Sequence, residues 1–428
     1  MGLFLYLFCL SGLVQGAEPP SRFPKPEFET GYVQPLTQCP APRAAYLEWV
    51  DVGVLAGALA LTAWLAIRKR SRRGILAMTV FSILYFGFFR RGCICPVGSI
   101  QNVAASLSST SFLLPWTVVL LFLLPLVFAL FFGRVFCAAV CPLGAIQDVM
   151  IRRPVRLPRV VSGALGLIPY LALGLAILYA VTGAGFVVCR HDPFVGFFRL
   201  GGTVTMLVSG AVFLLLGIFV ARPYCRFLCP YSVLLNWAAR FAARPVTITP
   251  DECVNCRLCE ASCPFDCILP TTPDRPPETR PVARRRLGWA VALVPAAVML
   301  GAVAGFAMHT VFAAGHPVVR LAGRIALEER LQMREYTLES EAFRGTGQPL
   351  AQLDAEARAI LARFRIGSTV MGGVLGLVVG GQLVGLALWS RRKTYEIDNG
   401  NCLSCGRCFE YCPVGRPGGK GAGQDHGN

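Results

Sequence analysis

The sequence predicts an all-α membrane bundle of about seven spans that carries a small cytoplasmic α+β module assembled from two separated segments. Three observations support this fold class. Hydrophobic residues make up 54% of the 428 residues and charged residues only 15%, which is typical of integral membrane proteins. Seven apolar stretches have, or nearly have, the ~20 residues that cross a bilayer core. Two cysteine-rich segments follow the fifth and the seventh of these stretches.

The first 47 residues come before the bundle. Residues 1–16 are apolar and end in small residues, which predicts a secretory signal peptide cleaved near Ala17. An uncleaved membrane anchor is the alternative. In either case we expect the Pro-rich arm of residues 17–47 to lie outside the cytoplasm.

The spans are expected at residues 50–67, 74–89, 112–132, 160–182, 203–220, 287–308 and 366–389. Clusters of Lys and Arg at alternate span ends place the N-terminus outside and the C-terminus in the cytoplasm, and Arg90 and Arg91 are the only strong exception. The formal charge of +17 therefore reflects membrane orientation, and we expect membrane lipid rather than nucleic acid as a partner. The chain is expected to be a multi-pass protein of the cytoplasmic (inner) membrane.

A cysteine cassette occurs four times in the five-span core of residues 48–245, in two repeats that cover residues 89–148 and 185–236. Each repeat has one cassette at an outer span end and one at an inner span end. The outer cassettes supply Cys93, Cys95 and Cys189, and the inner cassettes supply Cys137, Cys141, Cys225 and Cys229. Repeats that meet at an interface are a common way to build a site in a membrane protein.

Two further runs have the cysteine spacing of bacterial ferredoxins. The first, in residues 246–282, contains Cys253, Cys256, Cys259 and Cys263, and the second, in residues 391–428, contains Cys402, Cys405, Cys408 and Cys412. In two-cluster ferredoxins the fourth cysteine of each run binds the other cluster. We therefore expect a ferredoxin-like module with two [4Fe-4S] clusters, Cys412 completing the first and Cys263 the second; zinc is the alternative. Between the runs, residues 287–390 are expected to form a two-span hairpin with an outer helical segment at residues 309–365.

The four inner cysteines form two Cys-x3-Cys-Pro pairs: Cys137 with Cys141, and Cys225 with Cys229. Four thiolates are enough for a third iron–sulfur cluster, at the inner face. The alternative is a set of reduced cysteines packed between helices, because free cysteine behaves as a small hydrophobic residue.

The outer face offers Cys39, Cys93, Cys95 and Cys189, which would hold a fourth cluster or form disulfides. His191 is a candidate substitute ligand, and an ordinary interfacial histidine is the alternative. Neither Cys9, in the expected signal peptide, nor Cys267, just after Cys263, is assigned a role. The chain has four histidines and lacks the axial ligands that a pair of b-type haems needs within the bundle.

The two Cys-x3-Cys-Pro cassettes, followed by ferredoxin runs on the same side, resemble the NapH/NosR-type polyferredoxin membrane proteins over about residues 112–263 and the C-terminal tail. The resemblance implies transfer of electrons between a quinol or cytoplasmic donor and an extracytoplasmic reductase or its maturation system. The chain departs from the family because it lacks the outer flavin-binding domain of the NosR branch. Its ferredoxin runs are also separated by a pair of spans.

Two functions are consistent with these motifs. The first is transmembrane electron transfer through iron–sulfur clusters, between a cytoplasmic or quinol donor and an extracytoplasmic redox partner or carrier, with a quinone as a further candidate cofactor. The second is a maturation or thiol-relay protein that supports a secreted metalloenzyme. No catalytic residue is assigned, so we expect an electron-transfer subunit rather than a stand-alone enzyme.

Overall fold

The computed structural model describes residues 44–92, 96–108, 114–248, 256–272, 280–332, 336–387, 392 and 394–411. The expected signal peptide, nearly all of the Pro-rich arm, and the cysteines Cys39, Cys93, Cys95, Cys253 and Cys412 lie outside the described residues. The chain divides into two compact units. The larger unit contains residues 44–316 and 361–411, and the smaller contains residues 317–360.

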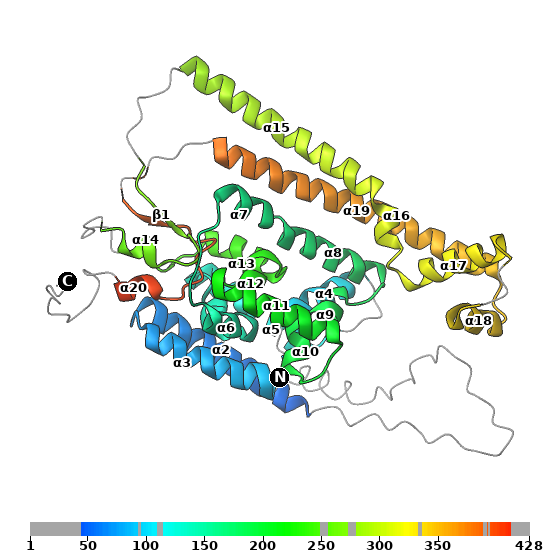
Figure 1. The fold of residues 1–428 in the computed structure, drawn as a ribbon, viewed down its shortest axis with the longest axis horizontal. Helices are drawn as coiled ribbons and strands as arrows, with labels where there is room; N and C mark the ends of the chain where they lie inside the picture. The colour runs from blue at the N-terminus through cyan, green and yellow to red at the C-terminus, as the bar shows by residue number, and fades with distance from the viewer. Residues whose placement is uncertain are drawn as a thin grey trace, which may run out of the picture. The chain divides into compact units, whose positions relative to one another are not determined.

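The core of the larger unit alternates long apolar helices with short ones (Figure 1). Its first half contains α2 (Ala45–Ile67), α3 (Arg72–Ser82), the π-helix η2 (Ile83–Phe89), α4 (Pro96–Ser108), α5 (Trp116–Phe132), the π-helix η3 (Phe136–Val140) and α6 (Pro142–Met150). Its second half contains α7 (Arg159–Leu165), α8 (Ile168–Thr182), α9 (Val187–His191), α10 (Pro193–Phe198), α11 (Val204–Phe219), α12 (Pro223–Phe227) and α13 (Tyr231–Arg240).

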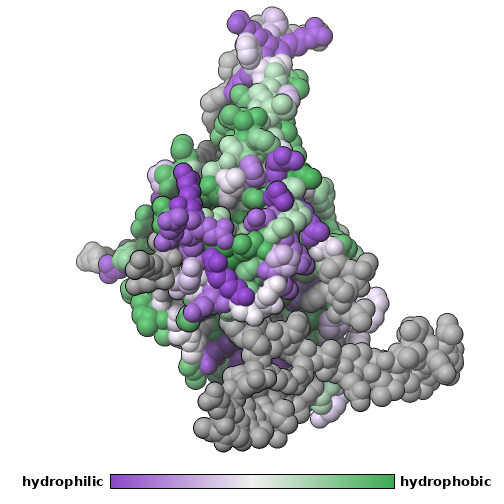
Figure 2. Space-filling view, turned by 90° about the vertical axis from the view of Figure 1, so that its right-hand side faces the viewer, coloured by the Kyte–Doolittle hydropathy of each residue, from purple (hydrophilic) through white to green (hydrophobic). Residues whose placement is uncertain are grey.

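The protein is a multi-pass membrane protein by the length and composition of its helices. Among the described residues, five helices are long and apolar enough to cross a membrane: Ala45–Ile67, Arg72–Phe89, Val160–Thr182, Pro281–Ala307 and Leu350–Leu386. The other two expected spans correspond to α5 and α11, which are apolar but only 17 and 16 residues long. Many large hydrophobic side chains are exposed, as expected of lipid-facing helices, and Figure 2 shows some of them as patches among hydrophilic residues.

Each cassette ends in a Cys-Pro or Asp-Pro pair, and its proline begins a short helix or comes directly before one. α4, α6 and α10 begin at Pro96, Pro142 and Pro193, and α13 begins directly after Pro230. Proline suits the first helical turn because the N–H that it lacks would have no partner within the helix. The π-helix η2 precedes the first cassette and η3 contains Cys137 of the second, and such widened turns are frequent near functional sites.

Arg90, which departs from the positive-inside pattern, is paired with a buried carboxylate. Its guanidinium lies 2.7 Å from Asp51 Oδ2, and the Tyr85 hydroxyl donates a hydrogen bond to Asp51 Oδ1 at 2.9 Å. Asp51 is only 1% exposed. Because Asp51 neutralises this arginine, the positive charge of Arg90 does not argue against the orientation that the other basic clusters predict.

The two cysteine runs come together in one small α+β module. The first run contributes α14 (Leu258–Ser262) and β1 (Ile268–Leu269), and the second contributes β2 (Glu396–Ile397) and α20 (Arg407–Tyr411). β1 pairs with β2 in antiparallel orientation, with Ile268 opposite Ile397. Asp398 N–H also donates to Cys267 O at 2.8 Å.

Between these runs, α15 (Arg280–Ala307) and α19 (Leu350–Ala387) form a helical hairpin, with α16 (His309–Ala313) after α15. Glycines lie where the two helices cross, since a Cβ at Gly372 would collide with Gly301 O and one at Gly376 would collide with Ala297 O. Small residues of this kind let membrane helices approach closely.

The smaller unit contains α17 (Pro317–Arg330), α18 (Leu338–Gly345) and the first part of α19. Ala322, Ile325 and Leu353 form its apolar core. The Ser340 hydroxyl donates to buried Glu328 at 2.9 Å. α19 continues without a break past residue 366, where the apolar pattern predicts the last span to begin.

Candidate metal centres

Cys263 lies with the cysteines of the second run, although it also packs against the group that contains Cys259 of its own run. It lines a small apolar cavity together with Cys402, Cys405 and Cys408, which we call the second-run cavity. The cysteine spacing predicts a crossed arrangement in which Cys263 binds the cluster of this run. Cys267, to which the sequence pattern assigns no role, is also on the cavity wall.

The thiols that line this cavity differ in pKa. The neighbouring Cys267 side chain and the backbone N–H groups of Phe265 and Cys267 lower the pKa of Cys263 to about 6, while the Cys267 S–H donates to Phe265 O at 3.4 Å. Burial raises the pKa of Cys402 to about 12, although the Ser404 N–H acts in the opposite direction. A thiolate at Cys402 is therefore costly unless a cation is bound to it, as iron would be.

The first run is only partly described. Cys256 is exposed and Cys259 is buried, whereas Cys253 and Cys412 lie outside the described residues. Cys259 packs with Ile268 and Tyr395, and Cys408 of the second run lies against the same group. Cys259 of the first run and Cys408 of the second run therefore contact the same small group of side chains.

The four inner cysteines also meet around one space. Cys137, in η3, and Cys141, just before α6, face Cys225, in α12, and Cys229, just before α13, across a small cavity that we call the cassette cavity. Its other walls are apolar, and they include Phe136, Leu143, Tyr231 and Leu235. Pro96 and Val97, at the start of α4, line this cavity too, so the first cassette helix begins against the inner set.

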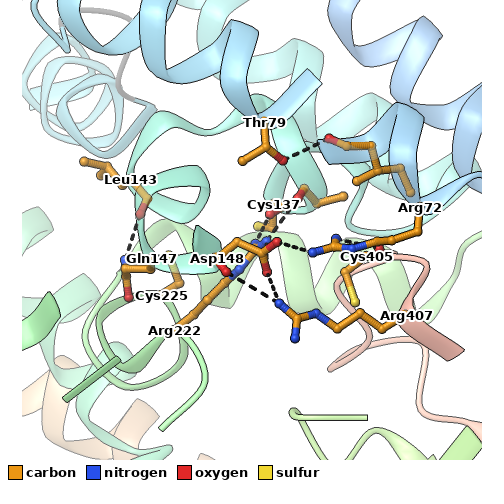
Figure 3. Close-up of polar contacts among 12 residues, drawn as sticks. Arg72, Thr79, Cys137, Leu143, Gln147, Asp148, Arg222, Cys225, Cys405 and Arg407 are labelled. Carbon is orange, nitrogen blue, oxygen red and sulfur yellow. Dashed lines mark hydrogen bonds and ion pairs between the residues drawn. The ribbon is translucent and has the colours of Figure 1, made fainter. Parts of the chain in front are cut away.

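Hydrogen-bond donors surround the cassette cavity (Figure 3). Gln147 donates from Nε2 to Cys225 Sγ at 3.4 Å and accepts from Tyr224 N at 3.1 Å. Arg222 donates to the backbone oxygens of Cys137 and Ala138. Arg222 is fully buried and has a φ of 49°, a left-handed conformation that is uncommon outside glycine and often held in place at functional sites.

Asp148 connects the cassette cavity to the second-run cavity. Its carboxylate lies 2.6 Å from Arg72, 3.0 Å from Arg222 and 3.4 Å from Arg407, and we call these four residues the Asp148 cluster. Burial alone would raise the pKa of Asp148, but the three arginines hold it well below its ordinary value. Arg72 also donates to Cys405 O at 2.9 Å, while Arg222 contacts Cys137 on the other side. Sequence spacing gives no signal for this cluster.

Within the described ranges, no three His, Cys, Asp or Glu side chains lie close enough to hold a single metal ion. The thiols instead surround a space in each of the two cavities. That arrangement suits a polynuclear cluster held by four thiolates better than a single zinc ion at the centre of a tetrahedron.

Of the outer set, the structure describes only Cys189 and His191. Cys189 is exposed, and His191 Nδ1 lies 2.9 Å from Val187 O of its own helix. A Cβ at Gly98 would lie 3.2 Å from Cys189 Sγ, and one at Gly144 would lie 3.7 Å from Cys225 Sγ. The glycine after the first Cys-Pro therefore approaches Cys189 much as the glycine after the second approaches Cys225.

Asp192 stands before Pro193, where the inner cassettes have a cysteine before proline. Its Oδ1 accepts from Phe194 N at 2.9 Å and caps α10. Its Oδ2 accepts from the Tyr224 hydroxyl at 2.8 Å. Both carboxylate oxygens are thus engaged, so Asp192 serves to position the third cassette. The Asp-Pro pair indicates the helix cap from sequence, but not the contact with Tyr224.

Comparison with known families assigns iron–sulfur domains to the same cassettes. A family model described as a 4Fe-4S binding domain matches residues 74–115, 114–160 and 203–248. A second family model of the same description matches residues 246–269. No solved structure matches the chain.

Three curated proteins illustrate the similarity. The uncharacterized protein MJ0750 of Methanocaldococcus jannaschii is 31% identical over 202 residues, which cover 44% of this chain and 80% of the relative. The uncharacterized protein MJ0749 of the same organism is 28% identical over 152 residues, 33% of this chain and 56% of the relative. YccM of Escherichia coli, a protein assigned to electron transport, is 34% identical over 68 residues, 16% of this chain and 19% of the relative. With these domain matches on a chain of apolar, membrane-length helices, the protein belongs to the polyferredoxin-type iron–sulfur membrane proteins.

Proposed function

We propose that the protein carries electrons across the membrane through iron–sulfur clusters. The 4Fe-4S domains and the likeness to YccM support iron–sulfur electron transfer in general. The observation that supports electron transfer most directly is the pair of cavities, each lined by four predicted ligand cysteines and joined by the Asp148 cluster. The transmembrane part of the proposal depends in addition on the outer set of cysteines.

The chain's own residues fit clusters in both cavities. Apolar walls would exclude water, and the arginines between the cavities supply positive charge next to thiolates. Arg134 Nη2 lies 3.8 Å from Cys137 Sγ, and its Nη1 donates to Gly400 O at 3.3 Å, so this arginine also contacts both sides. Clusters bound there would supply one-electron redox chemistry. Hydrogen bonds and nearby charge of this kind are what set the potentials of such clusters.

The finer assignment has four clusters in an inner membrane with the N-terminus outside. Two belong to the ferredoxin module, with ligands crossed between the runs, and one belongs to the cassette cavity. The fourth would be bound by Cys39, Cys93, Cys95 and Cys189. The approach of Gly98 to Cys189 supports a repeat of the inner geometry there. A cytoplasmic or quinol donor would supply electrons to these clusters, and an extracytoplasmic redox partner would receive them.

Iron and sulfide analysis of the anaerobically purified protein, with a redox titration followed by electron paramagnetic resonance, tests this proposal. Four clusters correspond to about 16 iron atoms per chain. Replacing Cys225 by Ser should remove about four of these, whereas Ser232→Ala, which changes the wall of the same cavity without removing a thiol, should remove none. Unchanged iron in Cys225→Ser would contradict a cluster in the cassette cavity.

A thiol relay that matures a secreted metalloenzyme is the second candidate. The exposure of Cys189 favours it, because the four cassette-cavity cysteines are buried or half-buried. This function predicts two clusters together with outer thiols that titrate with a thiol reagent. Four clusters and no reactive outer thiol would exclude it.

A further inference from the structure

A large pocket, separate from the two cysteine cavities in its main volume, lies between the helical core and the ferredoxin module. Its volume is about 560 Å³. The core contributes residues of α7, α8, α12 and α13, such as Tyr170 and Asn236, and the module contributes Leu269 and Asn401. Ligand pockets of folded proteins have this size.

The pocket wall is strongly basic. Five arginines line it, against two carboxylates, Glu260 and Asp266. Both carboxylates are already paired: Glu260 lies 3.6 Å from Arg156, and Asp266 lies 3.8 Å from Arg156 and 3.9 Å from Arg226. The pocket's two carboxylates therefore do not neutralise its three remaining arginines, Arg134, Arg240 and Arg392.

These three arginines have no ion-pair partner among the residues that the structure describes. Arg134 contacts Cys137 and Gly400, so thiolates in the cassette cavity would account for its charge. Arg240 donates only to the neutral Asn236 side chain, at 3.2 Å. Arg392 keeps a buried Nε without a hydrogen-bond partner. Arg240, which is exposed, and Arg392, which is half-buried, thus leave positive charge on the pocket wall that the described part of the chain does not neutralise.

The pocket reaches the ends of two spans, since Leu157 comes just before Val160–Thr182 and Gln382 is near the end of Leu350–Leu386. Tyr170 lies within the first of these spans, and Arg240 ends the short helix α13. Trp237, 55% exposed, donates to the Tyr170 hydroxyl at 3.3 Å. Tryptophan and tyrosine collect at the level of lipid headgroups, and basic pockets between membrane helices bind anionic headgroups.

We propose that this pocket binds the phosphate headgroup of an anionic phospholipid, held by Arg240 and Arg392. Guanidinium groups bind phosphate through paired N–H donors. Arg240 and Asn236 belong to the core, whereas Arg392 and Asn401 belong to the second run. Asn236 Nδ2 already donates to Asn401 Oδ1 at 2.9 Å. The headgroup therefore joins the ferredoxin module to the membrane core.

The test compares the full-length protein in nanodiscs of phosphatidylcholine alone and of phosphatidylcholine with phosphatidylglycerol, followed by thermal unfolding and by native mass spectrometry of retained lipid. We expect phosphatidylglycerol to raise the melting temperature and to stay bound. The double variant Arg240→Gln/Arg392→Gln should bind it about 30-fold more weakly. Arg68→Gln/Arg73→Gln removes the same charge from exposed positions outside the pocket and should bind it normally.

Cluster absorbance and the melting temperature in phosphatidylcholine alone show whether each variant is folded. If the double variant does not fold, the lipid retained by Arg240→Lys is compared with the lipid retained by Arg240→Gln. Equal retention by these two single variants would overturn the proposal. A parallel experiment adds inorganic phosphate or pyrophosphate to the detergent-solubilised protein and tests whether a soluble phosphate binds at the same arginines. If it stabilises the wild type but not the double variant, the same arginines bind phosphate and the natural source is soluble rather than lipid. Equal phosphatidylglycerol binding by wild type and double variant would overturn the proposal, whatever the cluster content.

Discussion

Replacing Asp148 by Asn removes the carboxylate on which three arginines converge, while keeping the shape of the side chain. The side chains of Asp148 and Arg222 are both 0% exposed, and those of Arg72 and Arg407 are 10% and 22% exposed. Breaking a fully buried pair from one side costs about 3–5 kcal/mol, because the other charge stays buried and uncompensated. Arg407, at 3.4 Å and partly exposed, should add less than about 1 kcal/mol.

The loss should affect the attachment of the second run to the core, since Arg72 also holds Cys405 O and Arg407 belongs to α20. Thermal unfolding followed by cluster absorbance is the assay. At about 2–4 °C per kcal/mol for medium-sized domains, the melting temperature should fall by roughly 10 °C. Arg407→Gln is the matched control and should shift it by only a few tenths of that amount.

A double-mutant cycle isolates the central pair. If Asp148 acts mainly by neutralising Arg222, then Asp148→Asn combined with Arg222→Met should be less damaging than the sum of the two single variants. Additive losses, or an Asp148→Asn variant no less stable than Arg407→Gln, would refute the reasoning that the buried charge pair joins the two cavities.

Three further predictions concern other parts of the chain. Truncation after Trp389 removes β2 and α20, so both ferredoxin clusters should be lost from the spectrum; one intact four-iron cluster with an unchanged signal would show that the runs are independent. Cys93→Ser should lower the bound iron without changing the ferredoxin signals. If the iron content is unchanged and the mass of the native chain shows a disulfide, only the thiol-relay function remains. Gly372→Ala should destabilise the α15–α19 hairpin by an overpacking cost of about 1–3 kcal/mol in thermal unfolding, because its Cβ meets backbone. Gly381→Ala, with open space around it, should be neutral, and equal effects of the two would contradict the close crossing.

Local sequence patterns predict much of this molecule. Apolar stretches of membrane length predict the positions of the five long spans, because a bilayer requires long apolar helices whatever the rest of the chain does. The ferredoxin spacing likewise predicts that Cys263 leaves its own run, because ligand crossing is built into that short motif. The structure places Cys263 in the second-run cavity.

Other site residues have no sequence signal. Arg72, Arg222 and Arg407 come from three distant segments, and only tertiary packing brings their guanidinium groups to Asp148. Cys267 follows no ligand spacing, but the turn after Cys263 places both side chains on the wall of the second-run cavity. The basic pocket similarly depends on α13 meeting the loop before β2.

By itself, the sequence determined what is local: helix length, the prolines that begin the cassette helices, and the positions of the candidate cysteine ligands. Only the tertiary structure decided which side chains surround those cysteines and which charges share a partner. The physical reason is that thiolate grouping and charge compensation depend on distances of a few ångströms between segments far apart in the chain. Those distances follow from how the helices pack, which spacing along the sequence does not encode.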